Sequence, residues 1–360
     1  MSLTGEPRVY AHLDMDAFYV SVELQRRPDL VGKPVVVAGS GPRAVVTTAS
    51  YEARRFGVFS ATPAERARRL CPGAVFLPPD FELYRARSRE LHAVLRAHVE
   101  RVEQVGLDEA YLDLTGIERY RAAARRVKEA VRSQTGLTCS VGIGPSKLVA
   151  KVASDAEKPD GFVELSAAGA RERFAGASPR LVPGIGPKTA ERLEALGIAT
   201  LGALGATSDE RLAGWFGPRL GRQLGALARF EDERLVETVR AAKSESRETT
   251  FDRDLHGLAE LEPVLERLAR ELCRTLGGQG ARGRTIGIKV RFADFSTVTR
   301  ARSLGAPVND LETVLAVALE LLRKLDPRRP VRLLGVRVAG LDEEGQMDRS
   351  GGEAQLSLAL

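Results

Sequence analysis

The order of strand and helix patterns before residue 145 limits the possible folds most strongly. Val9, Ala11 and Leu13 alternate with other residues and lead into a helical pattern, which predicts a strand that enters a helix. Later patterns predict a helix over 81–100, strands over 102–105 and 110–114, a helix over 118–134 and a strand over 138–143. This order predicts a split βαβ sheet with a small subdomain inserted early.

The residue patterns of the rest of the chain differ from those of this first part. The chain has 360 residues, which is more than one hydrophobic core usually fills. Inside the insertion, short strands over 35–38 and 44–48 flank a glycine-rich turn, which indicates a hairpin. Glycine and short helical patterns dominate from 180 to about 230, with no convincing strand. The polar stretch 240–250 indicates a linker, after which strand and helix patterns alternate again to Leu341. We therefore expect several domains.

Composition excludes several classes of protein. Hydrophobic residues make up 43% and charged residues 28%, as in ordinary soluble proteins rather than disordered or fibrous ones. No apolar run is long enough to span a membrane, and the polar start shows no signal peptide. Three distant cysteines indicate a reducing cytoplasm, and four scattered histidines without a CxxC motif offer little for a zinc site.

The net charge of +6 gives a mild preference for polyanions. Between Arg274 and Arg302, seven basic residues accompany one acid, which leaves both a solvated face and a nucleic-acid surface open. Over 286–292, apolar residues alternate with Gly, Lys289 and Arg291. This alternation predicts a strand with one apolar face and one basic face, which suits contact with a nucleic-acid backbone.

The placement of acidic residues is the strongest chemical signal. Asp14 lies where a predicted central strand ends, and Asp108 and Glu109 lie in the turn between two later strands. In a βαββαβ sheet these points can be neighbours, and three carboxylates at one place repel one another and need a cation. Oxygen ligands alone favour Mg²⁺ or Mn²⁺ over zinc. Taken singly, each acid is more often a cap or a surface charge, and we assign Asp16 as the cap of the following helix.

Adjacent residues of a regular strand point to opposite faces. Asp108 and Glu109 can therefore share a metal ion only where the ladder is distorted, and Gly106 just before them makes a turn there plausible.

Two further groups of residues suit phosphate. Tyr51 and Arg54 are three residues apart on one predicted helix face, and the guanidinium fork fits phosphate oxygens. Lys147, Lys151 and Lys158 would align on a helix that ran that far, and the proline after Lys158 places this lysine at the helix end. Without a neighbouring acid cluster, a solvated helix face would be the better interpretation.

Two glycine-containing motifs predict different local structures. The segment 142–147 (GIGPSK) lacks the spacing of a phosphate loop, so we expect a strand end packed against a helix start. The segment 182–188 (VPGIGPK) resembles a helix-hairpin-helix turn, which presents backbone N–H groups to a DNA phosphate. The candidate DNA contacts of these two surfaces are Gly184, Gly186, Lys188, Lys289, Arg291 and Arg300.

With these residues in view, the chain resembles the Y-family (translesion) DNA polymerases of the bacterial DinB, or DNA polymerase IV, type. The resemblance covers nearly the whole length. Its carriers are 14–19 (DMDAFY), 50–54 (SYEAR), 107–113 (LDEAYLD), 147–161, 183–186 (PGIG) and 243–251 (KSESRETTF).

The resemblance implies an α+β, multidomain, right-hand polymerase. Its parts would be a βαββαβ ferredoxin-like palm, small inserted fingers, a helix-hairpin-helix thumb and an α/β little finger. The implied division is palm at 1–25 and 80–166, fingers at 26–79, thumb at 167–236, linker at 237–246, little finger at 247–341, and a flexible tail at 342–360.

The resemblance also implies roles for individual residues. Asp14, Asp108 and Glu109 would take the catalytic acid positions, and the Met15 carbonyl would complete the set that holds two Mg²⁺ ions, for which Mn²⁺ can substitute. Tyr19 matches the aromatic steric gate that excludes ribonucleotides. The residues that match triphosphate-binding positions are Thr48, Tyr51, Arg54 and Lys158.

The implied activity is template-directed addition of dNTPs to a primer 3′-OH by two-metal-ion nucleotidyl transfer, with low fidelity, in DNA repair and damage tolerance. The implied partners are primer–template DNA, dNTPs and the sliding clamp, and we expect a cytoplasmic monomer without membrane association. The clamp-binding residues would be Gln355, Leu356, Leu358 and Leu360. A frayed apolar chain end is the alternative interpretation of this peptide.

One departure and two alternatives remain. The family usually carries Ser where this chain has Gly106, which puts the local hydrogen bonding of the turn in question. A non-catalytic DNA-binding accessory protein on the same scaffold would be marked by loss of the acids, which are present here. A nucleotidyl cyclase with a similar palm does not explain the hairpin motif or the basic C-terminal sheet.

Overall fold

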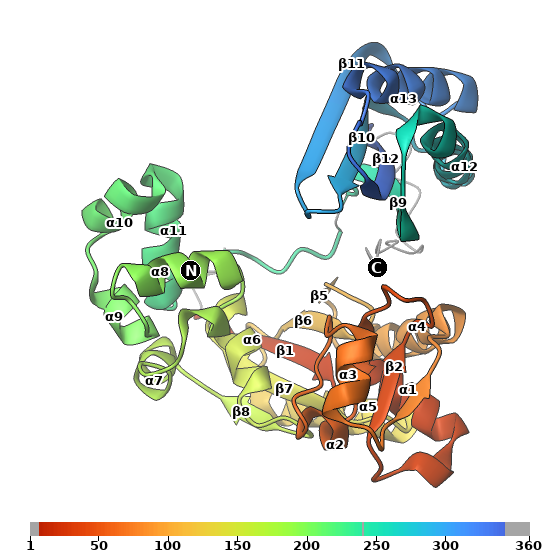
Figure 1. Ribbon diagram of the computed structural model, residues 1–360. Coiled ribbons are helices and arrows are strands. Elements are labelled where there is room, and N and C mark those ends of the chain that lie inside the picture. Colours follow the sequence, from red (N-terminus) through yellow and green to blue (C-terminus); the bar gives the residue numbers. More distant parts are fainter. Residues whose placement is uncertain (1–6, 240, 343–360) are drawn as a thin grey trace. The chain divides into compact units, whose positions relative to one another are not determined.

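The computed structural model describes residues 7–239 and 241–342 and contains three β-sheets (Figure 1). The described residues form two compact units. The first contains the chain up to Val37, Thr48–Arg55 and Ala74–Thr238, and the second contains Ala38–Thr47, Phe56–Gly73 and the chain from Val239.

A five-stranded sheet of order β5-β6-β1-β7-β8 is central to the first unit. Strand β1 lies between β6 and β7 and is antiparallel to both, whereas β7 and β8 are parallel. The elements are β1 (Tyr10–Met15), α4 (Phe81–His98), β5 (Val102–Gln104), β6 (Glu109–Asp113), α5 (Tyr120–Thr135), β7 (Cys139–Gly144), α6 (Lys147–Asp155) and β8 (Phe162–Glu164). The order β1-α4-β5-β6-α5-β7 confirms the predicted βαββαβ pattern.

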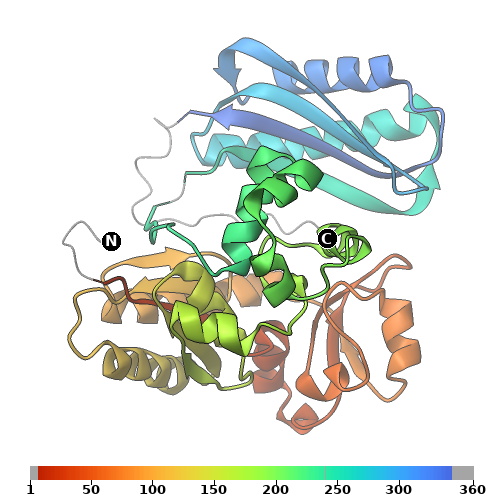
Figure 2. The same cartoon turned by 90° about the vertical axis from the view of Figure 1, so that its left-hand side faces the viewer.

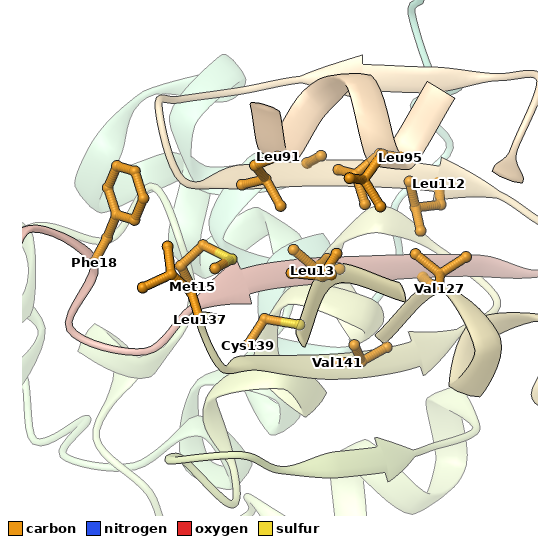
Figure 3. Packing of buried hydrophobic residues seen from close by; sticks show 14 of the residues in the cluster. Leu13, Met15, Phe18, Leu91, Leu95, Leu112, Val127, Leu137, Cys139 and Val141 are labelled. Atoms are coloured by element: carbon orange, nitrogen blue, oxygen red, sulfur yellow. The ribbon is translucent and has the colours of Figure 1, made fainter. Parts of the chain in front are cut away.

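The two faces of this sheet have different roles. Leu13 of β1 points to the face covered by α4 and α5, where it is buried with Leu95 and Val127 (Figure 3). Because side chains alternate along a strand, His12 and Asp14 point to the opposite face, where α6 lies. The apolar face forms the core, and the other face is left for polar chemistry.

Helix α6 approaches the sheet closely because β7 carries glycine where the helix crosses it. A Cβ atom on Gly142 would lie 2.1 Å from both the Ala150 carbonyl oxygen and the Ser154 nitrogen. The side chain of Ser146 caps the helix by accepting a hydrogen bond from the Val149 nitrogen at 3.3 Å. The prediction of a strand end packed against a helix start is confirmed.

The insertion between β1 and α4 contains a three-stranded sheet of order β3-β2-β4, in which β2 and β4 are parallel. The predicted strands of the hairpin, β2 and β3, are neighbours in this sheet. The elements before α4 are α1 (Phe18–Arg26), η1 (Pro28–Leu30), β2 (Val35–Ala38), β3 (Val46–Ala49), α2 (Tyr51–Arg54), α3 (Ala64–Leu70) and β4 (Val75–Leu77).

The chain from 167 to 228 is helical, and its described residues contain no strand, as predicted. Buried leucines form its core, among them Leu193, Leu204, Leu212 and Leu224. The elements are α7 (Ala167–Arg173), η2 (Pro179–Leu181), α8 (Pro187–Ala195), α9 (Leu201–Ala206), α10 (Asp209–Phe216) and α11 (Pro218–Ala228).

The second unit contains a four-stranded sheet of order β11-β10-β12-β9, with α12 and α13 on one face (Figures 1 and 2). Ile286, Ile288 and Val290 of β10 are buried in its core, which confirms the predicted alternation. The elements are β9 (Ser244–Leu255), α12 (Gly257–Gly278), β10 (Gly283–Phe292), β11 (Thr297–Val308), α13 (Leu311–Leu325) and β12 (Val331–Leu341).

One prediction about this unit is wrong. The polar composition of 240–250 predicts a linker, but β9 begins at Ser244 and pairs with β12, with Glu245 opposite Val338 and Thr250 opposite Leu333. Main-chain hydrogen bonds hold this strand, so its polar side chains do not prevent pairing. The structure therefore extends the C-terminal sheet into a segment whose composition is typical of a linker.

Candidate active site

The acidic residues meet at one edge of the five-stranded sheet. Asp14 near the end of β1 is directly opposite Glu109, which begins β6. The Met15 nitrogen donates a hydrogen bond of 3.0 Å to the Asp108 carbonyl oxygen, which ties the turn before β6 to the end of β1. The predicted convergence of Asp14, Asp108 and Glu109 follows from this register.

Two lysines contact these acids. The Nζ atom of Lys151 lies 2.7 Å from Oδ2 of Asp14 and 3.4 Å from Oε2 of Glu109, so one ammonium group bridges the two carboxylates. The Nζ atom of Lys158 lies 2.6 Å from Oδ1 of Asp14. Both lysines also contact Asp155, at 3.6 Å and 3.1 Å respectively. The lysines are therefore part of the acid cluster and do not form a solvated helix face.

The electrostatics of the cluster shift the pKa values of its two adjacent acids, Asp108 and Glu109, in opposite directions. Burial, together with the charges of Asp14 and Glu109, raises the pKa of Asp108 to about 7, although Lys158 opposes this rise. Burial would also raise the pKa of Glu109, but the 3.4 Å contact with His12 and the charge of Lys151 outweigh it and lower this pKa to about 2. Burial alone would lower the pKa of Lys151, and the neighbouring acids, Asp14 first, raise it instead. Asp108 thus lies in a negative environment that a further cation would relieve.

The donor chemistry of this edge fits a hard divalent cation. Carboxylate oxygens of three residues and main-chain carbonyl groups at the strand end are the ligands that Mg²⁺ and Mn²⁺ prefer. Across residues 7–239 and 241–342, no three His, Cys, Asp or Glu side chains are already arranged as a metal cluster. In this structure the ammonium groups of Lys151 and Lys158 contact the two carboxylate oxygens of Asp14.

His12 is a site residue that the sequence analysis missed. Its ring is fully buried, with Nδ1 2.8 Å from Oγ of Ser154 and Nε2 3.4 Å from Oε2 of Glu109. Burial lowers the pKa of His12. Its position two residues before Asp14 in an apolar strand was a usable signal, because residues two apart share a face.

The assignment of Asp16 as a helix cap is wrong. Helix α1 begins after Ala17, which has φ 45° and makes no side-chain cap. The carboxylate of Asp16 instead accepts hydrogen bonds of 2.8 Å from Oγ of Ser140 and 2.8 Å from the Asp160 nitrogen. The Tyr51 hydroxyl donates to the same carboxylate at 3.4 Å. Asp16 is buried, and its carboxylate links β7 and α2 to the loop that follows Lys158.

The structure places the predicted phosphate-binding residues on β3, on α2 and just after α6. The guanidinium carbon of Arg54 lies 4.4 Å from the centre of the Tyr51 ring, and its Nε donates to the Ala49 carbonyl at 3.0 Å. Thr48 lies on β3, nearly buried, three residues before Tyr51. Tyr51 and Lys158 thus contact aspartates in or just after β1, whereas Arg54 lies against the Tyr51 ring.

The ring of Tyr19 on α1 is packed against aromatic residues of α4. It stacks on Tyr84 with ring centres 4.4 Å apart and meets Phe81 edge-on at 6.1 Å. Burial, with the charge of Asp108 as a second cause, raises the pKa of Tyr19 to about 12. The ring is therefore fixed on the side of the site that carries Asp108.

The residues predicted to contact DNA lie on exposed or partly exposed surfaces. Gly184, at φ 99°, and Gly186 form an exposed turn before α8, and Lys188 follows in the first turn of that helix. This turn matches the predicted hairpin, although only the short η2 helix precedes it directly.

On the four-stranded sheet, the three basic candidates have different partners. Lys289 is paired with Glu248 at 2.8 Å. Arg291 donates to Thr297 at 3.0 Å, and Arg300 donates to the Thr299 carbonyl at 2.9 Å. The charge of Lys289 is therefore already partly balanced within the protein.

The four residues of the predicted clamp-binding peptide, Gln355, Leu356, Leu358 and Leu360, lie outside the described residues. Among the described helices, none combines the length and the apolar character needed to cross a membrane.

Comparison with known proteins gives three matches along the chain. Residues 13–155 match the impB/mucB/samB family, and residues 242–358 match the C-terminal domain of the same family. Residues 180–232 match the thumb domain of DNA polymerase-iota. The matched segments contain the acid cluster, the basic sheet and the glycine turn.

Individual relatives agree with these matches. A DNA polymerase IV of Streptomyces coelicolor is 44% identical over 343 residues, which are 94% of this chain and 72% of that protein. A DNA polymerase IV of Methanoculleus marisnigri is 42% identical over 347 residues, covering 94% of this chain and 96% of that protein. The solved structure of a Y-family DNA polymerase chimera, 27% identical, matches with a TM-score of 0.82 and covers 92% of this chain and 99% of that chain.

Proposed function

We infer that this chain, which belongs to the impB/mucB/samB family, is a DNA-directed DNA polymerase of the Y-family. It adds dNTPs to a primer 3′-OH under the direction of a template, and it performs translesion synthesis with low fidelity. It binds primer–template DNA and dNTPs, and it uses divalent metal ions. We propose below which residues carry these functions.

We propose that Asp14, Asp108 and Glu109, with the Met15 carbonyl, hold two Mg²⁺ ions, for which Mn²⁺ can substitute. The observation that carries this proposal is the meeting of three carboxylates at one sheet edge, where the pKa of Asp108 is raised to about 7. When bound, such ions lower the pKa of the primer hydroxyl and balance the charge of the triphosphate and pyrophosphate. The protein side chains position these groups and do little covalent work.

Lys151 and Lys158 have distinct proposed roles in this site. Lys151 lies between Asp14 and Glu109 and fixes the spacing of these carboxylates before a nucleotide arrives. Lys158 lies beyond the end of α6, so its ammonium group can exchange Asp14 for phosphate oxygens. With the guanidinium of Arg54 and the hydroxyls of Tyr51 and Thr48, it would bind the incoming triphosphate.

Tyr19 is the proposed sugar gate. Tyr84 and Phe81 fix its ring, so a ribose 2′-OH in this place would meet a ring that cannot turn aside. The protein would thereby select deoxyribonucleotides by shape.

The DNA backbone is the proposed partner of the two exposed surfaces. The Gly184–Gly186 turn presents main-chain N–H groups to a phosphate, and Lys188 adds a positive charge beside it. Lys289, Arg291 and Arg300 would contact phosphates from the four-stranded sheet without reading base identity.

Primer extension on gapped DNA tests the activity and the metal together. With Mg²⁺, we expect the purified chain to extend the primer with the dNTP that the template specifies and to reject the matching rNTP. Extension without a divalent ion, or incorporation that ignores the template, would contradict the proposal.

We also propose that residues 355–360 bind the sliding clamp and that the chain acts as a cytoplasmic monomer. The sequence QLSLAL supports the first proposal, because its regularly spaced leucines suit an apolar groove on a partner. Deletion of 355–360 should remove stimulation by the clamp and leave synthesis without the clamp unchanged. Equal clamp stimulation with and without this peptide would reject the proposal.

A further inference from the structure

Side chains that do not belong to the acid cluster contact the turn that carries Asp108. Their common partner is the carbonyl oxygen of Gly106. This oxygen lies 3.3 Å from Nε2 of His92 on α4, and Nε2 of Gln104 donates to it at 3.2 Å. One turn further along α4, Arg96 donates to Oε1 of Gln104 at 3.2 Å. Two side chains thus reach one main-chain oxygen, two residues before Asp108.

Within the described part of the chain, the polar contacts of His92 are all with the main chain of this turn. Its neighbours on α4, Leu91 and Leu95, point into the apolar core (Figure 3), and the His92 ring is itself only 1% exposed. Its second ring nitrogen, Nδ1, is buried and has no hydrogen-bond partner among the described residues. A buried polar atom without a hydrogen-bond partner lowers the stability of the fold, and an apolar residue would avoid this loss. A buried histidine at this position therefore needs a specific reason.

The chemistry of the ring fits a donor to the carbonyl. Burial first, and then the charge of Arg96, lower the pKa of His92 to about 4, so the ring is neutral at physiological pH. A neutral imidazole next to a carbonyl oxygen carries its proton on the facing nitrogen, here Nε2.

Among the described residues, the main chain of this turn makes further hydrogen bonds, and Leu107 packs against the apolar core. The Asp108 carbonyl accepts from the Met15 nitrogen, and the Val105 and Gly106 nitrogens both approach the Glu109 carbonyl, at 3.1 Å and 3.4 Å. Gly106 has no side chain of its own with which to fix the turn. The contact between His92 and the Gly106 oxygen therefore adds a polar link between the turn and α4 to the apolar packing of Leu107.

We propose that His92 is a positioning residue, which acts through the Gly106 carbonyl to hold Asp108 in place for metal binding. Gln104 and Arg96 support the same contact from β5 and α4. This inference rests on the proposed function of Asp108 as a metal ligand.

Variants at position 92 can separate the hydrogen bond from simple packing. In His92→Gln the amide nitrogen can take the place of Nε2, whereas in His92→Asn the shorter side chain cannot reach the carbonyl. Ser88→Ala is the matched control, because Ser88 is buried one turn earlier on α4. A thermal unfolding curve for each variant shows whether it is folded.

The Mg²⁺ dependence of single-nucleotide incorporation is the first readout. We expect His92→Asn to need about 10 to 100 times more Mg²⁺ for half-maximal rate, with unchanged affinity for primer–template DNA. His92→Gln and Ser88→Ala should stay close to the wild type. The same Mg²⁺ dependence in His92→Asn and the wild type would overturn the proposal, and so would equal losses in the Gln and Asn variants.

Hydrogen exchange without metal is the second readout and does not depend on activity. The amides of residues 105–109 should exchange faster in His92→Asn than in Ser88→Ala, since the turn loses its polar link to α4. Equal exchange would overturn the proposal. A wild-type chain that does not extend primers would instead contradict the proposed function, and these amides would still report on the turn.

Discussion

The Tyr19 ring is fixed by packing rather than by a hydrogen bond of its own. It stacks on Tyr84, whose hydroxyl donates to Glu23 at 2.7 Å, and it meets Phe81 edge-on. A ring held on two sides cannot move away from a larger sugar. At the scale of a single residue, we therefore expect sugar selection to depend on the aromatic ring and not on its hydroxyl.

Tyr19→Ala should admit ribonucleotides, because the small side chain leaves room for a 2′-OH. We expect the ratio of dNTP to rNTP incorporation efficiency to fall by at least about tenfold. Tyr19→Phe, which keeps the ring, should retain the wild-type ratio. If Tyr19→Ala still discriminates as the wild type does, Tyr19 is not the gate.

The sequence could predict Asp14, Asp108 and Glu109 because they lie at strand ends whose order in a βαββαβ sheet makes them neighbours. It could not predict the role of Asp16, because an aspartate before a helix looks the same whether it caps the helix or accepts distant hydrogen bonds. His12 was missed because its partner Ser154 lies on an element far away in the sequence.

At the scale of elements, the close contact between β7 and α6 places Lys151 over the acids. Gly142→Ala would put a Cβ atom 2.1 Å from main-chain atoms of α6 and force the helix outward. We expect the variant to lose about 1 to 3 kcal/mol of unfolding free energy or more, together with primer extension.

Gly214→Ala is the matched control, because Gly214 lies within α10 and a Cβ atom added there would meet no neighbouring atom within 4 Å. This change should be neutral or stabilising by up to about 1 kcal/mol, since alanine favours a helix. Denaturant unfolding curves compare the two variants, and a Gly142→Ala protein as stable as the wild type would refute the packing argument.

The burial of His92, a residue of α4, predicts a stability that depends on pH. In the unfolded chain this histidine takes up a proton near its ordinary pKa of 6.5, whereas in the folded protein it does so only near 4. The unfolded state binds more protons between these values, so the unfolding free energy falls as pH drops through this range and levels off below it.

His92 should contribute a loss of up to about 3 kcal/mol over this range. Urea unfolding between about pH 7.5 and about pH 4 should therefore show a smaller loss for His92→Gln than for the wild type. If the unfolding free energies of the two proteins had the same pH dependence, His92 would be protonated equally in the folded and unfolded states.

Four strands of the five-stranded sheet, all except the three-residue β8, were predictable because apolar residues alternate or cluster along them and turn residues bound them. Strand β9 was not, because its residues Ser244 to Arg247 are polar and its pairing is made by main-chain atoms. A pattern of hydrophobicity carries no signal for a strand held in this way.

At the scale of the whole molecule, the excess of positive charge should appear as salt-dependent DNA binding. Arg300 is exposed and donates to the carbonyl of its neighbour Thr299, whereas Lys289 is paired with the carboxylate of Glu248. Arg300→Ala should reduce the slope of log affinity against log salt by about 1, and Lys289→Ala should reduce it less. Equal slopes for the wild type and Arg300→Ala would remove Arg300 from the DNA surface.

We expect catalysis at the acid cluster to be separable from binding to DNA. The most direct measurement is single-nucleotide incorporation with Mg²⁺ by Asp108→Ala, together with its affinity for primer–template DNA. Asp113→Ala, at the far end of β6, is the control and should keep its activity. We predict that Asp108→Ala loses incorporation by about 100-fold or more while its DNA affinity stays within about twofold. Incorporation near the wild-type rate would contradict this prediction.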